Sequence, residues 1–180
     1  MKSTMLLVCI FGFALISQAY AQTKESIMSA GHIQGSRYEN AALGLTYEIP
    51  KSVEVDSKFA ATASPDALLA ALDRKWKLGR HQNMVLLAAA QTDLSPEQLS
   101  ASKVADLQGR TGFRWIEQPH NLEVNGVSGL FSAWELGTAA GSFAIRDGKY
   151  LLVWSFGATD EKSLRELAES IKSIRLAVQP

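Results

Sequence analysis

Cysteine is almost absent from this sequence, since Cys9 is the only one among 180 residues. It lies in an N-terminal segment that we expect to be removed from the mature chain. A mature chain without cysteine forms no disulfides and has no thiolate to act as a nucleophile or a metal ligand. The hydrophobic core must therefore stabilise the domain by itself.

The first 21 residues have the features of a secretory signal peptide. Lys2 supplies the positive charge of the n-region, and Met5 to Ile16 is an unbroken run of apolar and small residues. This run is shorter than the roughly 20 residues that span a bilayer. Ala19-Tyr20-Ala21 then provides an A-x-A cleavage site. We expect an exported protein, periplasmic or secreted after cleavage near Ala21, whose mature chain has no transmembrane segment.

A lipoprotein is the alternative, because Leu6-Leu7-Val8-Cys9 is similar to a lipobox. Val8 is too large for the position before the cysteine. Cys9 also comes too early for a full apolar region to precede it. These two features favour the plain signal peptide.

An excess of charge of either sign is also missing. Removing Lys2 from the 18 basic residues leaves 17 against 18 acidic residues, a net charge of −1. This balance gives no reason to expect a nucleic-acid partner or an anionic membrane surface.

The mature chain, 22–180, has the length of one domain. Gln22 to Ser36 is polar and shows no periodicity, so we interpret it as a flexible leader. We expect the single domain to span 37–180, because no repeat, low-complexity tract or second linker interrupts that range.

Three stretches predict helices. In the first, Ser64-Pro65-Asp66 has an N-cap and a first-turn proline, with apolar residues at helical spacing up to Gly79. In the second, Ser95 and Gln98 form a capping box around Pro96, and the helix ends near Gln108. The third begins at Thr159 and carries an apolar stripe to Ile174.

Strand patterns account for most of the remaining chain. Residues 45–49 alternate and stop at Pro50, and Val53 to Asp56 is a possible partner strand. Residues 84–90 form an unbroken apolar strand, which requires cover on both faces. Further strands lie at 113–117 and in two hairpins, for which Asn125-Gly126 and Asp147-Gly148 predict type I′ turns.

These elements predict an α+β fold, an α/β/α sandwich on a mostly antiparallel sheet of about seven strands with three helices. In the strand that follows Lys149, Tyr150, Leu152, Trp154 and Phe156 should face one side of the sheet. Leu151 and Val153 should face the other.

Three stretches resemble the PsbP-like fold family, which includes the extrinsic PsbP proteins of photosystem II and bacterial envelope proteins. They are the opening "YENAALGLTYEIP" at Tyr38 to Pro50, the hairpin "NLEVNGVSGLFSAWEL" at Asn121 to Leu136, and the last hairpin with its helix at Ser142 to Ile174. The resemblance implies the PsbP-like fold over most of the mature chain.

Within that opening, the resemblance rests on Tyr38, Asn40, Gly44-Leu45 and Pro50. The chain departs from the family pattern after the proline, where Ser52-Val53 stands in place of a tryptophan. The family has no shared catalytic motif, so the resemblance implies no catalytic residue.

The candidate catalytic and metal-binding residues favour a structural role over a catalytic one. Ser100 and Lys103 match S-x-x-K but lack the other elements of such acyl-enzymes, and Ser128 follows a hairpin turn rather than a nucleophile elbow. His32, His81 and His120 have no ligand-like neighbours at metal-site spacing. We therefore expect no catalytic, metal or cofactor residues, although ligands far apart in sequence remain an alternative.

A basic cluster surrounds one tryptophan near the end of the first predicted helix. Its positive side chains either complement the negative end of that helix or bind an anion or an acidic partner. We take it as the possible partner-binding patch for an unknown protein or a small anionic ligand. The patch consists of Arg74, Lys75, Trp76, Lys77 and Arg80, with His81 beside it.

The sequence therefore favours an exported, non-enzymatic binding or scaffolding protein of the cell envelope. The alternative is a hydrolase or a small-ligand-binding protein whose site is assembled from distant residues.

Overall fold

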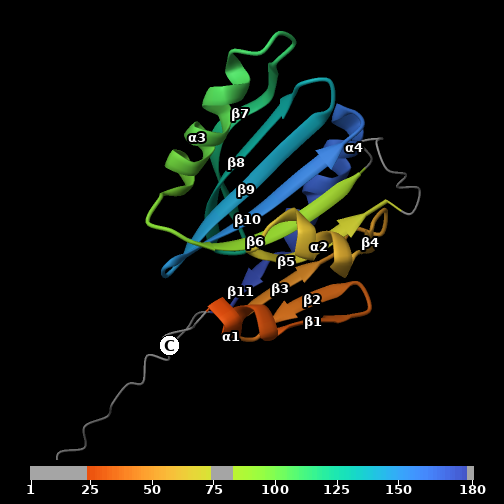
Figure 1. The fold of residues 1–180 in the computed structure, drawn as a ribbon, viewed down its shortest axis with the longest axis vertical. Coiled ribbons are helices and arrows are strands. Elements are labelled where there is room, and N and C mark those ends of the chain that lie inside the picture. Colours follow the sequence, from red (N-terminus) through yellow and green to blue (C-terminus); the bar gives the residue numbers. More distant parts are fainter. Residues whose placement is uncertain (1–23, 74–82, 178–180) are drawn as a thin grey trace, which may run out of the picture.

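The computed structural model describes residues 24–73 and 83–177 (Figure 1). Seven strands form a large sheet in the order β4-β5-β6-β10-β9-β8-β7, and every pairing within it is antiparallel. This confirms the predicted α+β class and the mostly antiparallel sheet of seven strands. The strands are β4 (Glu54–Val55), β5 (Ala67–Leu72), β6 (Met84–Gln91), β7 (Arg114–Val124), β8 (Val127–Glu135), β9 (Ala139–Asp147) and β10 (Tyr150–Ala158).

A second, four-stranded antiparallel sheet packs against one face of the large sheet, and the sequence did not predict it. Its order is β1-β2-β3-β11. Figure 1 shows it at one end of the molecule, close to β5. The strands are β1 (Gly31–Gln34), β2 (Arg37–Asn40), β3 (Leu45–Glu48) and β11 (Arg175–Leu176).

Five helical segments complete the described chain. They are α1 (Lys24–Ser29), α2 (Ser57–Ala63), α3 (Pro96–Gln108), α4 (Glu161–Ala168) and the 3₁₀-helix η1 (Glu169–Ser173). None of the helices within the described ranges is long and apolar enough to cross a bilayer.

The central strand β10 divides the interior into two unequal parts, as its alternation predicts. Its Leu152 and Trp154 belong to the main core, which also contains residues of the small sheet, α4 and η1. Leu151 and Val153 face the opposite side, where Leu99 of α3 packs against them. The two faces of the sheet are therefore covered by different elements.

Helix α3 begins as its sequence predicts. The Ser95 hydroxyl accepts a hydrogen bond from the Gln98 N–H at 3.2 Å, and the Gln98 side chain accepts one from the Ser95 N–H at 2.8 Å. Pro96 occupies the first turn, and Gly109 is the C-cap. Local capping chemistry alone is enough to place this helix.

Replacing Ser95 with alanine is expected to lower the free energy of unfolding by about 0.5–2 kcal/mol, because the Gln98 N–H loses its acceptor. Urea unfolding of the purified protein measures the change. Ser102→Ala is the matched control, since its hydroxyl only donates to the Leu99 carbonyl within the same helix. Equal losses in the two variants would contradict the capping role.

The structure corrects the first predicted helix. Residues 67–72 form strand β5, which lies between β4 and β6. Leu68 and Leu72, which suggested helical spacing, are also compatible with one face of a strand. Short apolar runs do not separate a buried strand from a helix. The Ser64 hydroxyl accepts from the Asp66 N–H at 3.2 Å, so Ser64-Pro65 is a turn and not a helix start.

The strand near Val55 is also paired differently from the prediction. It is β4, and it pairs with β5 instead of 45–49. The chain then enters the unpredicted helix α2, where Asp56 is the N-cap and accepts from the Phe59 N–H at 2.9 Å.

Both predicted hairpins are present, and one turn differs from the prediction. Asn125 and Gly126 have φ values of 53° and 79°, as a type I′ turn requires. In the second hairpin Asp147 pairs with Tyr150, so the two turn residues are Gly148 and Lys149. Only Gly148 has a positive φ there, 54°, which is the pattern of a type II′ turn.

The structure also corrects the predicted flexible leader over 24–34, where α1 and β1 form. Ile27 of α1 is buried, and its carbonyl accepts from the Asn40 side chain at 2.8 Å. The Asn40 side chain also contacts the Tyr38 hydroxyl at 3.1 Å and accepts from the Leu43 N–H at 3.2 Å. The leader lacks periodicity because a single buried residue, Ile27, anchors α1.

The residues that carry the family resemblance therefore have structural roles. Tyr38 and Asn40 hold α1 against the small sheet. Gly44 has φ +58°, and a Cβ there would lie 2.9 Å from Ala177. The motif thus fixes both ends of the described chain to the small sheet.

Candidate functional site: a pocket between a hairpin and a helix

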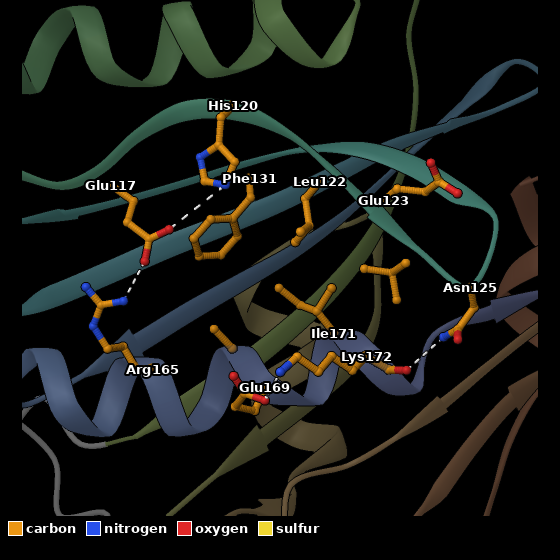
Figure 2. A pocket seen from close by; sticks show the side chains of 12 residues that line it. Glu117, His120, Leu122, Glu123, Asn125, Phe131, Arg165, Glu169, Ile171 and Lys172 are labelled. Atoms are coloured by element: carbon orange, nitrogen blue, oxygen red, sulfur yellow. Dashed lines mark hydrogen bonds and ion pairs between the residues drawn. The ribbon is translucent and has the colours of Figure 1, made fainter.

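A pocket of about 540 Å³ lies between the β7–β8 hairpin and the helical segment formed by α4 and η1 (Figure 2). We call it the hairpin–helix pocket. Its floor is apolar and belongs to the main core or packs against it. The floor residues are Leu122, Val124, Phe131, Ala168 and Ile171. Its volume is within the range of small-molecule sites, about 300–1,000 Å³.

The pocket forms because β7 leaves regular pairing near its middle. The register between β7 and β8 shifts on both sides of Glu117, before His120. Pro119, which has no backbone N–H, lies within this irregular stretch. Such irregularities bend and twist a strand. The irregular stretch lies at the pocket, since Glu117 and His120 both line it.

One end of the pocket is closed by the tip of the hairpin. Asn125 donates through its side-chain amide to the carbonyls of Lys172 at 2.7 Å and Ile174 at 2.9 Å. These carbonyls lie at the end of η1, where helical partners are missing. The turn residue that defines the hairpin therefore also fixes it to the helix.

The other end is closed by ion pairs. The Arg165 guanidinium of α4 lies 2.6 Å from the Glu117 carboxylate of β7 and 3.0 Å from Glu161. Arg114 joins the same group by contacts with Glu161, at 3.2 Å, and with Glu135. The chain of charges Glu135, Arg114, Glu161, Arg165 and Glu117 thus connects β8, β7 and α4.

These contacts shift the ionisation of the groups involved. Hydrogen bonds from Arg165 and then Arg114 lower the pKa of Glu161. The hydrogen bond to Glu161 raises the pKa of Arg165, and Glu117 adds to it. A lowered carboxylate pKa means that this contribution to stability is present at neutral pH and is lost in acid, as the pH falls through the pKa of Glu161.

His120 lies at the ion-paired end of the pocket, above the apolar floor. Its ring meets Phe131 edge to face, with 5.7 Å between ring centroids. Its Nδ1 lies 2.9 Å from the Gln118 carbonyl, and its Nε2 lies 4.0 Å from the Glu117 carboxylate. Figure 2 shows Glu117 and His120 on β7, with Arg165 facing Glu117 from α4.

The side chains that line the pocket are mostly apolar or charged. No serine, threonine or cysteine is among the residues that line the pocket. The Glu117 carboxylate is already paired with Arg165. Within 24–73 and 83–177, no three His, Cys, Asp or Glu side chains are grouped to hold a metal ion. The arrangement presents an apolar cavity with a polar end, as in ligand sites that orient an amphipathic molecule.

The structure describes some of the candidate residues singled out in the sequence and not others. The basic patch of Arg74, Lys75, Trp76, Lys77 and Arg80, and also His81, fall outside the described residues. His32 lies on β1, with its Nε2 3.4 Å from a Glu39 carboxylate oxygen. His120 is the only one of these candidates that the described chain places in the pocket.

The Ser100 and Lys103 pair is not brought together in a reactive pocket. Ser100 is 8% exposed and lines a shallow hollow between α3 and β7. Its hydroxyl has no hydrogen-bond partner in the described chain. Lys103 occupies an exposed position and does not line that hollow.

Sequence reasoning missed the hairpin–helix pocket because its walls are far apart in the chain. Glu117 and Arg165 are separated by 48 positions. Asn125 gave a hairpin signal and Ile171 a helix-stripe signal, but neither pattern shows that the two elements face each other. His120, an aromatic polar residue beside Pro119, was the one sequence feature that could have indicated a binding site here.

The fold that contains this pocket is PsbP-like, as the resemblance implied. The structure is similar to the solution structure of the cyanobacterial PsbP protein CyanoP from Synechocystis, with a TM-score of 0.56 and 9% sequence identity. That similarity covers 82% of this chain and 96% of CyanoP. Identity at this level concerns the fold alone.

Two further solved structures are similar at lower scores. The Ran-binding protein Mog1p of Saccharomyces cerevisiae has a TM-score of 0.49 and 12% identity, covering 81% of this chain and 96% of Mog1p. LpqN of Mycobacterium tuberculosis, involved in cell envelope biogenesis, has a TM-score of 0.47 and 14% identity, covering 72% and 82%. No protein-family model and no curated protein sequence matches the chain.

Proposed function

We propose that this protein is exported and acts in the cell envelope as a non-enzymatic binding protein, with the hairpin–helix pocket as its binding site. The observation that carries the proposal is the cavity of about 540 Å³ with an apolar floor. Contacts at both ends fix the hairpin to the helical segment, so the cavity between them needs little rearrangement to accept a ligand. The features of the first 21 residues support export.

The basic patch of Arg74, Lys75, Trp76, Lys77 and Arg80 remains a separate proposal for a protein or small anionic partner. Recovery of a partner from envelope extract with the wild type and with Arg74→Ala/Lys75→Ala tests it. Unchanged recovery would remove the patch as the partner site.

The pocket is tested with a neutral apolar probe, N-phenyl-1-naphthylamine, whose fluorescence rises when it leaves water. Ala168 lines the pocket and is half-buried, so Ala168→Phe places a ring in the cavity. We expect the wild type to bind the probe and Ala168→Phe to bind it at least tenfold more weakly, because the ligand loses buried apolar contact.

Ala61→Phe is the matched control, since Ala61 is exposed on α2. This control should bind the probe as the wild type does, and circular dichroism should show that both variants are folded. Probe binding by Ala168→Phe at the wild-type level would contradict the proposed site. Turnover of a defined ester or peptide by the wild type would favour the hydrolase alternative.

A further inference from the structure

The polar end of the pocket presents two hydrogen-bond acceptors to each other. A backbone carbonyl only accepts, so the 2.9 Å contact with Gln118 requires the proton on Nδ1 of His120. In the neutral ring, Nε2 is then an acceptor. It faces the Glu117 Oε2 atom at 4.0 Å, too far for a hydrogen bond. A donor placed between the two atoms would satisfy both.

The ion pairs at this end of the pocket also leave an excess of negative charge. Glu117 is the last member of the alternating chain Glu135, Arg114, Glu161, Arg165 and Glu117. Three carboxylates and two guanidinium groups give this chain a net charge of −1. The nearby Lys172 and Glu169 pair with each other and leave that charge unchanged, and Glu123, which also lines the pocket, adds a further negative charge. A positive group at the pocket end of the chain would offset this excess.

Both acceptor side chains are accessible to a ligand that occupies the pocket. His120 is 45% exposed and Glu117 is 33% exposed at the side chain. Phe131 contacts the His120 ring and is part of the floor, so the acceptor pair and the apolar surface are adjacent. A ligand there therefore meets acceptors at one end and apolar carbon along its length.

From this geometry, and resting on the proposed function of the pocket, we infer that its ligand is an apolar primary amine whose ammonium group is held between Glu117 and His120. An ammonium carries three hydrogen-bond donors and one positive charge. It can therefore donate to both acceptors and offset the negative charge. A metal ion fits less well, because two candidate ligands are too few for a closed site. Free alkylamines and peptide lysine side chains share this chemistry.

A second mode of recognition would be the addition of a strand to the outer edge of β7. Pro119 and His120 oppose it. Pro119 lacks a backbone donor, and His120 already donates to the Gln118 carbonyl. Both features block the ladder that an added strand needs. Recognition through the pocket is therefore the better-supported mode for this side of the molecule.

The test measures displacement of bound N-phenyl-1-naphthylamine by n-hexylamine, by hexanoate and by Nα-acetyl-lysine N-methylamide. In the last compound the side-chain ammonium is free. We expect hexylamine to compete at least tenfold better than hexanoate, which has a similar apolar chain and the opposite charge. Competition by Nα-acetyl-lysine N-methylamide would point to peptide lysines as the source, and its absence to free amines. Equal competition by hexylamine and hexanoate would overturn the inference.

Two variants locate the ammonium. Glu117→Gln removes the negative charge but keeps a side-chain oxygen that can accept from Arg165. Hexylamine competition, measured relative to each variant's own affinity for the neutral probe, should weaken at least tenfold. His120→Phe keeps an aromatic ring against Phe131 but lacks the Nε2 acceptor. This variant should weaken hexylamine competition severalfold.

Glu39→Gln is the matched control, because Glu39 also pairs with an arginine and a histidine but lies on β2 in the small sheet, away from the pocket. Wild-type amine competition in Glu117→Gln would overturn the inference even if the probe binds, whereas failure of the wild type to bind the probe would refute the proposed function itself.

Discussion

Trp154→Ala is expected to lower the free energy of unfolding by about 3–5 kcal/mol, the range for large aromatic residues removed from a packed core. Trp154 is fully buried on β10, at the centre of the large sheet. Its ring lies 6.0 Å from that of Tyr47 in the small sheet and 6.1 Å from that of Phe143 in β9. The side chain therefore joins the two sheets, and its loss removes contacts on both sides.

Guanidinium unfolding monitored by circular dichroism measures this loss. Trp134→Ala is the matched control, since Trp134 is half-buried on β8 and lies outside the main core. We expect the control to lose clearly less stability than Trp154→Ala. A loss below about 1.5 kcal/mol at Trp154, less than the burial of a large apolar side chain is worth, would show that the sheets are not joined there.

The indole nitrogen of Trp154 makes a second comparison possible. Its Nε1 is buried without a hydrogen-bond partner in the described chain. An unsatisfied buried donor costs about 1–3 kcal/mol, and phenylalanine lacks it. Trp154→Phe should therefore be much less destabilising than Trp154→Ala.

Asn40→Ala is expected to lower the free energy of unfolding by about 1–3 kcal/mol, because it leaves the Ile27 carbonyl without the donor that Asn40 supplies. Asn40 is fully buried, and its amide is the contact that holds α1. Hydrogen exchange should show that the α1 amides lose protection first. Asn121→Ala, at an exposed position of β7, is the control and should be nearly neutral. Unchanged protection of α1 in Asn40→Ala would contradict this role.

Features encoded within a few residues could be predicted from the sequence. The capping box around Pro96, the Asn125-Gly126 turn and the alternation of β10 are confirmed. A glycine inside a strand indicates a close approach of neighbouring groups, and at Gly129 of β8 a Cβ would lie 2.5 Å from Ile145. Each of these signals is a steric or hydrogen-bonding requirement of one residue and its immediate neighbours.

Features that depend on long-range pairing could not be predicted. Residues 67–72 are compatible with a helix or a buried strand, and only their place between β4 and β6 decides. The small sheet pairs β3 with β11, whose Leu45 and Leu176 come from opposite ends of the domain. The pocket has the same origin, because Glu117 and Arg165 meet only after β7 and α4 pack together.

The central claim is that the cavity between the β7–β8 hairpin and α4 is where this protein binds its ligand. Amide chemical-shift mapping with N-phenyl-1-naphthylamine tests it most directly. The account predicts the largest shifts at Leu122, Phe131 and Ile171, and none at β1 or α3. Shifts centred on α3 or on the small sheet, with the pocket amides unmoved, would contradict it.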